Sequence, residues 1–364
     1  MKLKDISSYL DNIVPISFEE SYDNSGLQTG DTEKEISSAI VALDVTEDVI
    51  DEAVASGCNL IVSHHPLIFN PLKKITGRTY VERIIIKAII NEIAIYSSHT
   101  NLDILKDGVS RKMAEKLNLH NIKVLSPLKN HLLKLVTYIP ENHFEKVREA
   151  VFVAGAGVTG NYDNCSFSHP GTGSFRAGAG SDPYVGEKGK IHFEKEIRFE
   201  TILPTHLKER VIKALIAAHP YEEVAYDVYA LENEYNGAGL GCTGELSVEM
   251  EETDFLNHIS HVFNAGGVRF SKLTGKKIKS VALCGGSGIS LLGDAIRSGA
   301  DVFLTSDIKY HDFFNAGNII LLVDTGHYES EIFSSEILYD LIIKKFPTFA
   351  VRFSETNTNP INYL

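Results

Sequence analysis

The sequence VALDVTEDVIDEAVASGCNLIVSHHP, residues 41–66, decides the fold. It begins with an apolar run, continues with apolar residues at helical spacing, and reaches a Ser56–Gly57 pair that is typical of a helix end. A second apolar run follows. Because Pro66 cannot donate a hydrogen bond to a sheet, this run should end as a strand near Ser63. The segment therefore predicts a strand, a helix and a second, parallel strand.

A second stretch, VALCGGSGISLLGDAIRSGADVFLTSDIKYHD at residues 281–312, follows the same plan. Its Ser298–Gly299 pair matches Ser56–Gly57, and residues 305–307 match residues 63–65. Parallel units of this kind place their functional loops at the carboxyl ends of the strands. We therefore predict an α/β fold built from two related halves, with equivalent loops at the two corners.

The similarity between the halves extends by one further strand. In the first half an apolar run leads to SSHTNLD, which contains His99 and Asp103, and in the second a similar run leads to DTGHYESE, which contains His327 and Glu331. In both pairs the carboxylate follows the histidine by four residues. If the chain is helical from Tyr328, His327 and Glu331 share one helix face. A solvent-facing ion pair is the alternative interpretation of such a motif.

These strand ends gather residue types that bind metals. Taken alone, adjacent histidines are more often one buried and one solvated side chain. Three imidazoles and two carboxylates at strand ends of one α/β layer instead suit two first-row metal ions about 3.5–4 Å apart. The five candidate ligands are His64, His65, Asp103, His327 and Glu331.

Composition excludes several classes of protein. The 364 residues are 43% hydrophobic and 23% charged, and no apolar run has the length of a membrane span. The net charge of −13 disfavours binding to nucleic acid. The first 15 residues lack the apolar centre of a secretory signal, so we expect an amphipathic first helix and a cytoplasmic protein. The cysteines lack CxxC spacing, which argues against a zinc ribbon or disulfides: Cys58, Cys165, Cys242 and Cys284.

Two glycine-containing loops carry weaker signals. GGSG at residues 285–288 lies between a predicted strand and a predicted helix, where its amides could hold an anion. It lacks both the dinucleotide fingerprint and the Walker lysine. The loop SYDNSGLQTG, residues 21–30, reads on residue types alone as a simple connection.

The middle of the chain follows another pattern. Its predicted elements have the order βαββαβ, which describes a ferredoxin-like domain. They are a strand at 132–139, a helix at 141–155, strands at 162–167 and 190–200, a helix at 203–220 and a strand at 224–231. We expect a Gly-rich excursion at 169–190 within the hairpin, and a return hinge at 233–241.

Six blocks in this order resemble the GTP cyclohydrolase I type 2 homologues, also called Nif3-like dinuclear-metal proteins. The blocks are SYDNSGLQTG, IVSHHPLIF, SSHTNLD, HPYEEVAYDVY, the GGSG and LTSDIKYHD region, and DTGHYESE. The resemblance covers essentially the whole chain. It implies a Nif3-like domain in two α/β halves, residues 1–130 and 235–364, around an inserted PII-like domain, residues 131–234. It also implies a toroidal homohexamer.

The resemblance implies the same five metal ligands, with Glu331 as the bridge between two divalent ions per chain. Zinc is the preferred metal, with manganese, iron, cobalt and nickel as alternatives. Positions near the site that match the family motifs are His99, Asp307, Lys309 and His311, and Asn24, Gly26 and Leu27 are expected to line the same cleft. The chain departs from many relatives at Tyr22 and Ser306, neither of which is a predicted ligand.

The reaction suggested by the family name is hydrolysis of a small molecule, such as a purine nucleotide. A metal-bound hydroxide would attack C8 of a guanine nucleotide, and the candidate catalytic residues are His99, His311 and Asp307, with His99 or His311 transferring protons. Two alternatives stay open. One is a metal-holding scaffold or regulator whose PII-like domain senses a small ligand, and the other is a two-metal phosphoesterase.

Overall fold

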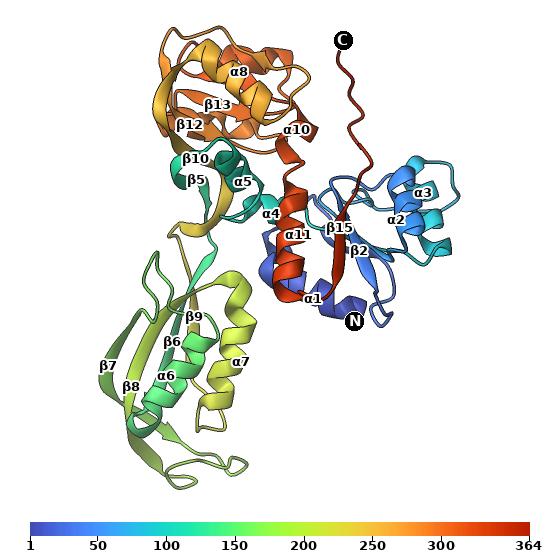
Figure 1. The fold of residues 1–364 in the computed structure, drawn as a ribbon. Helices are drawn as coiled ribbons and strands as arrows, with labels where there is room; N and C mark the ends of the chain where they lie inside the picture. Colours follow the sequence, from blue (N-terminus) through green and yellow to red (C-terminus); the bar gives the residue numbers. More distant parts are fainter. The chain divides into compact units, whose positions relative to one another are not determined.

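The structure is a computed structural model that describes all 364 residues, and it divides into two compact units (Figure 1). The first unit combines Met1–Ser126 with Ala238–Leu364, and the inserted unit is Pro127–Gly237. The boundaries expected from the sequence, after residues 130 and 234, lie close to these divisions. No helix has both the length and the apolar character needed to cross a membrane. All four cysteines are free thiols.

The first unit contains a five-stranded sheet of order β1-β4-β3-β2-β15, in which only β1 is antiparallel to its neighbour. Its central strands are almost completely buried, as expected for parallel strands covered on both faces. The helices α2 and α3 cover one face and α1 and α11 the other. The bounds are β1 (Gly26–Thr29), β2 (Ser38–Ala42), β3 (Leu60–Ser63), β4 (Ala94–Ser97), β15 (Ala350–Phe353), α1 (Leu3–Ile13), α2 (Glu47–Ser56), α3 (Tyr80–Ile90) and α11 (Ser334–Lys345).

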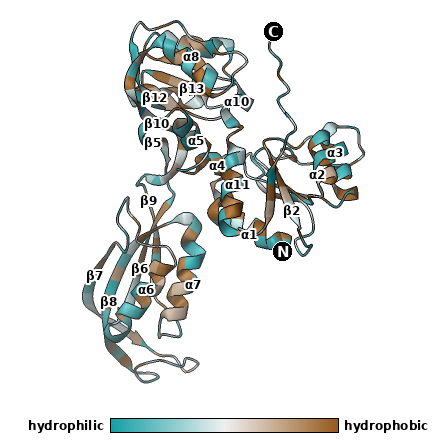
Figure 2. Cartoon of the chain, viewed as in Figure 1, coloured by the Kyte–Doolittle hydropathy of each residue, from teal (hydrophilic) through white to brown (hydrophobic).

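Alternation along the strands explains how one sheet serves two cores. Ile61 of β3 packs with α2 and α3, whereas its neighbours Leu60 and Val62 pack with α1 and α11. The strand ends at Ser63, and the predicted stop before Pro66 is confirmed. Figure 2 shows the apolar colouring of these buried strands and the mixed colouring of the helices that cover them.

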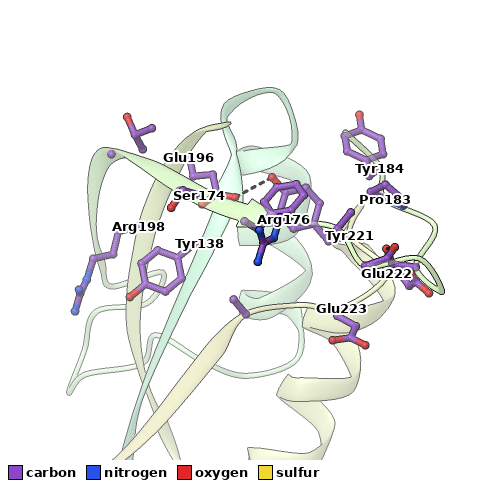
Figure 3. Close-up of a pocket in the computed structure, with 18 of the residues that line it drawn as sticks. Tyr138, Ser174, Arg176, Pro183, Tyr184, Glu196, Arg198, Tyr221, Glu222 and Glu223 are labelled. Carbon is purple, nitrogen blue, oxygen red and sulfur yellow. Dashed lines mark hydrogen bonds between the residues drawn. The ribbon is translucent and has the colours of Figure 1, made fainter. Parts of the chain in front are cut away.

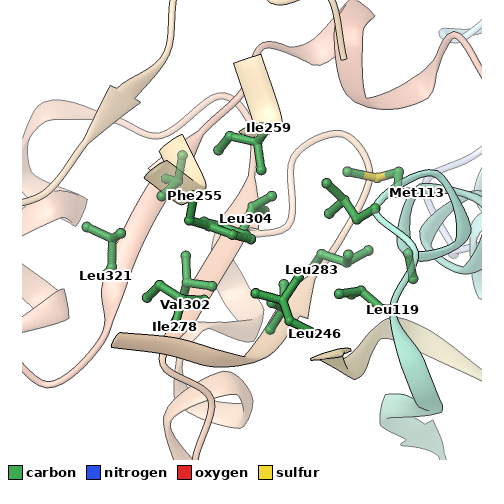
Figure 4. Close-up of a cluster of buried hydrophobic side chains, with 14 of the residues drawn as sticks. Met113, Leu119, Leu246, Phe255, Ile259, Ile278, Leu283, Val302, Leu304 and Leu321 are labelled. Atoms are coloured by element: carbon green, nitrogen blue, oxygen red, sulfur yellow. The ribbon is translucent and has the colours of Figure 1, made fainter. Parts of the chain in front are cut away.

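The second sheet of this unit has the order β11-β14-β13-β12-β10-β5, with β12, β13 and β14 parallel. Its core against α5 and α8 is shown in Figure 4 and includes Met113, Phe255, Ile259 and Leu304. The strand bounds are β5 (His120–Leu128), β10 (Tyr235–Glu251), β11 (Arg269–Phe270), β12 (Lys277–Leu283), β13 (Val302–Thr305) and β14 (Leu321–Asp324). The helices are α5 (Val109–Lys116), α8 (Glu252–Val262), the short helix η4 (Ile289–Leu291), α9 (Leu292–Arg297) and η5 (Tyr310–Ala316).

The repeated strand–helix–strand plan is confirmed, and the two predicted helix ends are equivalent. Gly57 follows α2 with φ of 70°, and Gly299 follows α9 with φ of 76°. A side chain is strained in this left-handed region, so glycine suits both positions. The carboxyl ends also correspond, because Ser63 pairs with Ser97 in one sheet and Thr305 pairs with Asp324 in the other.

Each half contributes an element to the sheet of the other half. The predicted ranges 1–130 and 235–364 do not include this exchange. β15, from the end of the chain, pairs with β2 of the first sheet, and α11 packs on the same sheet. β5, from the first half, joins the second sheet. Pairing with β15 protects an edge of β2 that would otherwise be open.

The inserted unit has a four-stranded antiparallel sheet of order β7-β8-β6-β9, with α6 and α7 packed in its core. Its elements follow the order βαββαβ. They are β6 (Leu132–Pro140), α6 (Phe144–Val153), β7 (Ser166–Arg176), β8 (Ile191–Pro204), α7 (Lys208–Ala218) and β9 (Tyr226–Leu231).

Two predictions about this region are wrong. β7 continues to Arg176, so the Gly-rich excursion begins only at Ala177 rather than at residue 169. The expected hinge at 233–241 is part of the long strand β10 from Tyr235. Glycines lower strand propensity, but β7 pairs with β8 over its whole length, and β10 lies between β12 and β5 in its sheet.

Candidate metal centre

The predicted ligands occupy loops and short helices at the carboxyl ends of both sheets. His64 and His65 follow β3 directly, and Asp103 lies in α4 (Thr100–Ile104), which follows β4. His327 and Glu331 begin and end α10 (His327–Glu331), which follows β14. The helix predicted from this region is therefore present, and its first and last residues share one face.

The Glu331 carboxylate lies at the centre of this group. Its Oε2 atom is 2.8 Å from His65 Nε2, 2.9 Å from His327 Nε2 and 3.8 Å from His64 Nε2. Asp103 Oδ1 lies 3.6 Å from His64 Nε2. The structure thus brings all five predicted residues together, and we call them the histidine–carboxylate cluster.

Two atoms of the cluster lack a hydrogen-bond partner although they are buried. They are His64 Nε2 and Asp103 Oδ1, and they face each other at a distance too long for a hydrogen bond. The His64 side chain is completely buried. Buried polar atoms almost always have hydrogen-bond partners, so these two atoms indicate that a binding partner belongs between them. A divalent cation accepts both an imidazole nitrogen and a carboxylate oxygen, and the residues present therefore fit a metal.

Each of the three cluster histidines is held at its other ring nitrogen. The Nδ1 atoms lie 2.7 Å from the Ser98 carbonyl oxygen for His64, 2.6 Å from Asp44 Oδ1 for His65 and 2.7 Å from Asp307 Oδ2 for His327. Donation from Nδ1 leaves the Nε2 lone pair free, and this is how proteins orient histidines that bind metals.

Asp307, the third candidate catalytic residue, contacts the Nδ1 atom of His327 and so lies beside the cluster. Its backbone has a φ of 56°, a left-handed conformation that asparagine and aspartate tolerate better than other residues. Asp307 occupies the position in the second half that is equivalent to His65. It is not a histidine itself, but it holds the His327 ring.

Neighbouring charges dominate the protonation of the metal-free cluster. Burial lowers the pKa of His65, but hydrogen bonds with Asp44 and Glu331 outweigh it and raise the pKa to about 9. For His327 burial is likewise outweighed, by Asp307 and Glu331, and the pKa rises to about 11. Burial raises the pKa of Asp103. The site thus balances the Glu331 charge with positive charge even before a metal binds.

Glycine is required where the loop after β12 approaches Glu331. A Cβ atom on Gly286 would lie 1.9 Å from Glu331 Oε1, and Gly286 has a φ of 59°. Three amides of this loop are also occupied: Gly285 N donates to Ser110 Oγ, Gly286 N to Ser330 Oγ and Gly288 N to Thr305 Oγ1. Three of the four GGSG amides are therefore unavailable to an anion, and the loop instead makes room for the cluster.

His99 and His311 differ sharply in their surroundings. The His99 ring centre lies 5.4 Å from that of His64 and 5.5 Å from that of His65, and its Nδ1 lies 2.8 Å from Asp23 Oδ1. His311 is exposed, and its ring neighbours are Tyr310 and Phe314 of its own helical turn. Of these two predicted proton carriers, only His99 lies at the cluster.

The loop of residues 21–30 contributes more than a connection. Asp23 accepts hydrogen bonds from Thr100 N and Oγ1, at 3.0 and 2.5 Å, besides its contact with His99. These contacts hold the pKa of Asp23 well below its ordinary value despite burial. Asn24 donates to the Ile68 carbonyl oxygen. The loop thus supports His99, and the aspartate that does so was not among the predicted residues.

Asp44 was also missed by sequence reasoning. It is a single carboxylate after β2, and its second oxygen accepts a hydrogen bond from Thr358 Oγ1 near the end of the chain. The available signal was positional, because Asp44 lies at the carboxyl end of a parallel strand beside the one that carries His65.

Replacing Asp44 by asparagine should weaken metal binding by about tenfold to a hundredfold, because His65 loses its charged support while the ligands stay in place. Competition with a chelator measures this affinity. Asp48→Asn is the matched control, since Asp48 is exposed on α2 and should leave the affinity unchanged. Equal affinities for the two variants would contradict the supporting role.

Comparisons with known proteins agree over the length of the chain. A family model described as Duf34/NIF3 (NGG1p interacting factor 3) matches residues 1–360. A Halalkalibacterium halodurans protein named "GTP cyclohydrolase 1 type 2 homolog" is 40% identical over 358 residues, covering 96% of this chain and 95% of that protein. A Bacillus subtilis protein of the same name is 39% identical over 356 residues, with 96% and 95% coverage. The crystal structure of a Bacillus cereus protein related to NIF3 has a TM-score of 0.87 at 38% identity, covering 100% of this chain and 99% of that chain.

Proposed function

Because the chain belongs to the DUF34/NIF3 family, we propose that its histidine–carboxylate cluster holds two divalent metal ions and that the protein is a metal-dependent hydrolase. The observation that carries the proposal is the shared arrangement of His64, His65 and His327. Each ring is fixed at Nδ1 by an oxygen atom, and each Nε2 atom is directed toward Glu331. A set of solvated histidines would not need this common orientation.

The contacts suggest how the ligands divide between the ions. His64 lies against Asp103, and His65 Nε2 lies 3.3 Å from His327 Nε2. Glu331 contacts both pairs through one oxygen atom, which makes it the proposed bridge. Nitrogen and oxygen ligands of this kind suit zinc, and also manganese, iron, cobalt or nickel.

Two such ions would supply an acidified water and a Lewis acid that polarises an electrophilic carbon or phosphorus atom. The protein itself supplies the proton carrier. His99 is held at Nδ1 by Asp23, so its Nε2 atom can accept or return a proton beside the cluster. We propose a small substrate of the purine nucleotide class, in keeping with the name of the relatives.

Product analysis on a nucleotide panel tests this reaction. The metal-loaded protein is incubated with GTP, GMP, ATP and AMP, and formate and inorganic phosphate are measured separately. Release of formate supports ring opening, whereas release of phosphate alone would replace that reaction with phosphoester hydrolysis. If no nucleotide is consumed by protein with a filled metal site, the nucleotide proposal is wrong.

The surroundings of His99 predict a selective loss of turnover. His99→Gln should lower kcat by about a hundredfold, a typical contribution of a positioned proton carrier, without changing metal content. His311→Gln is the matched variant, and its exposed position predicts a change smaller than about threefold, the order of an ordinary surface substitution. A larger loss in His311→Gln than in His99→Gln would reverse the assignment of the two histidines.

The resemblance also supports a toroidal homohexamer and a PII-like inserted unit, which we propose as its assembly and its second module. Light scattering on the purified protein measures the assembly directly. A mass six times that of the chain supports the ring, and a stable monomer or dimer would contradict it.

A further inference from the structure

The inserted unit contains a cavity of about 830 Å³ that the histidine–carboxylate cluster does not use (Figure 3). Two stretches supply most of its lining: residues 169–184, which end β7 and begin the Gly-rich loop, and HPYEEV of residues 219–224, which follows α7. β6, β8 and Ala225 supply the rest. The volume falls within the usual range for small-molecule sites.

Internal contacts fix the wall of this cavity. Glu196 of β8 is buried, and it accepts a hydrogen bond of 2.8 Å from the Tyr221 hydroxyl group. A Cβ atom on Gly173 would lie 2.1 Å from Glu196 Oε2, so glycine at this position leaves room for the carboxylate. His219 accepts from Tyr221 N at one ring nitrogen and donates to the Tyr138 carbonyl oxygen at the other. The segment after α7 is therefore held against both β8 and β6 by contacts within the protein.

Aromatic rings provide flat apolar surfaces along the lining. Tyr221 lies 6.1 Å from Phe175 and 6.1 Å from Tyr184, between ring centres. In the view of Figure 3, Tyr138 and Arg198 lie at one end of the lining and Tyr184 and Tyr221 at the other. Such rings stack well on the face of a planar heterocycle, whatever its identity.

One lining cation is free to meet an anion. Arg198 already donates to Glu200, at 2.8 Å. The Arg176 side chain makes no hydrogen bond or ion pair, and in Figure 3 its guanidinium group lies among the other lining residues. Glu222 and Glu223 are exposed carboxylates of the same lining, and both can accept hydrogen bonds from amino or hydroxyl groups.

We propose that this cavity binds a nucleoside monophosphate. The base would lie against the tyrosines, the single phosphate would pair with Arg176, and donors of the base or the sugar would meet Glu222 and Glu223. Three glutamates face two arginines in the lining, and one of those arginines is already paired, so a triphosphate would meet repulsion. The proposal stands on the inserted unit alone and does not depend on the proposed hydrolase function.

Isothermal titration calorimetry on the full chain tests this site, with AMP, GMP, adenosine, guanosine and ATP as probes. At least one monophosphate should bind saturably and more tightly than both its nucleoside and ATP. In Arg176→Ala the affinity for the monophosphate should fall about tenfold, the factor expected for one charge-assisted contact. It should then approach the affinity for the nucleoside. Arg148→Ala is the matched control, because Arg148 is outside the lining, and it should bind like the wild type.

A second variant separates stacking from charge. Tyr184→Ala removes a half-exposed ring and should lower the affinities for the nucleoside and the monophosphate alike, by about fivefold or more. Absence of saturable binding in the wild type at millimolar probe would overturn the proposal, as would tighter binding of ATP than of AMP. Monophosphate binding that Arg176→Ala leaves unchanged would also overturn it, because a probe held at the histidine–carboxylate cluster would behave in that way.

Discussion

Replacing Glu331 by alanine is expected to remove bound metal and any hydrolytic activity together. Glu331 contacts His64, His65 and His327 through a single oxygen atom, so its loss affects the ligands of both proposed ions at once. Loss of a supporting residue alone costs up to about a hundredfold in metal affinity, and loss of the shared ligand should cost at least that much. Elemental analysis after dialysis measures the metal, and nucleotide turnover measures the activity.

Two further variants make this result interpretable. Glu331→Gln keeps the size of the side chain and removes its charge, and it should lose metal as well while remaining folded. Glu336→Ala, on α11, removes a carboxylate that pairs only with Lys112 and Lys116, and it should keep the full metal content. Retention of metal by both Glu331 variants would show that Glu331 is not a ligand.

The second large effect is expected for Gly286→Ala. The new methyl group would lie 1.9 Å from Glu331 Oε1, so either the loop or the carboxylate must move. The left-handed backbone adds a cost of about 1–2 kcal/mol to the free energy of folding. We expect a lower melting temperature and a loss of metal comparable with that of Glu331→Ala.

The chain offers a control that isolates the backbone cost. Gly299 has a φ of 76° at the end of α9, and a Cβ atom there would meet nothing within 4 Å. Gly299→Ala should therefore lower stability by the backbone cost alone and keep its metal. Equal metal content in the two alanine variants would contradict the view that Gly286 gives Glu331 its space.

Periodicity and residue spacing predicted the parallel units well, because buried parallel strands are nearly continuous apolar runs with clear stops. Ser63 ends β3 where Pro66 requires it, and Gly57 and Gly299 end the equivalent helices. The four-residue spacing of His327 and Glu331 likewise predicted a shared helix face. Local rules suffice where a single segment fixes the geometry.

The remaining features depend on contacts between distant segments, which no local pattern contains. Asp44 and Asp23 are single aspartates whose importance comes from the histidines that fold against them. β15 joins the first sheet from the end of the chain, and β10, which has a glycine-rich start, lies between β12 and β5. The close approach of Gly286 to Glu331 also joins the loop after β12 to helix α10, so the sequence suggested an anion site in its place.

The most direct test of the paired centre is the metal content of the wild-type protein, purified without chelator, supplied with zinc and measured by elemental analysis. We expect about two ions per chain, because the histidine–carboxylate cluster offers two ligand pairs joined by Glu331. A content of one ion or none in protein supplied with excess metal would contradict the paired centre. His64 and His65 would then be hydrogen-bonded histidines without neighbouring ions.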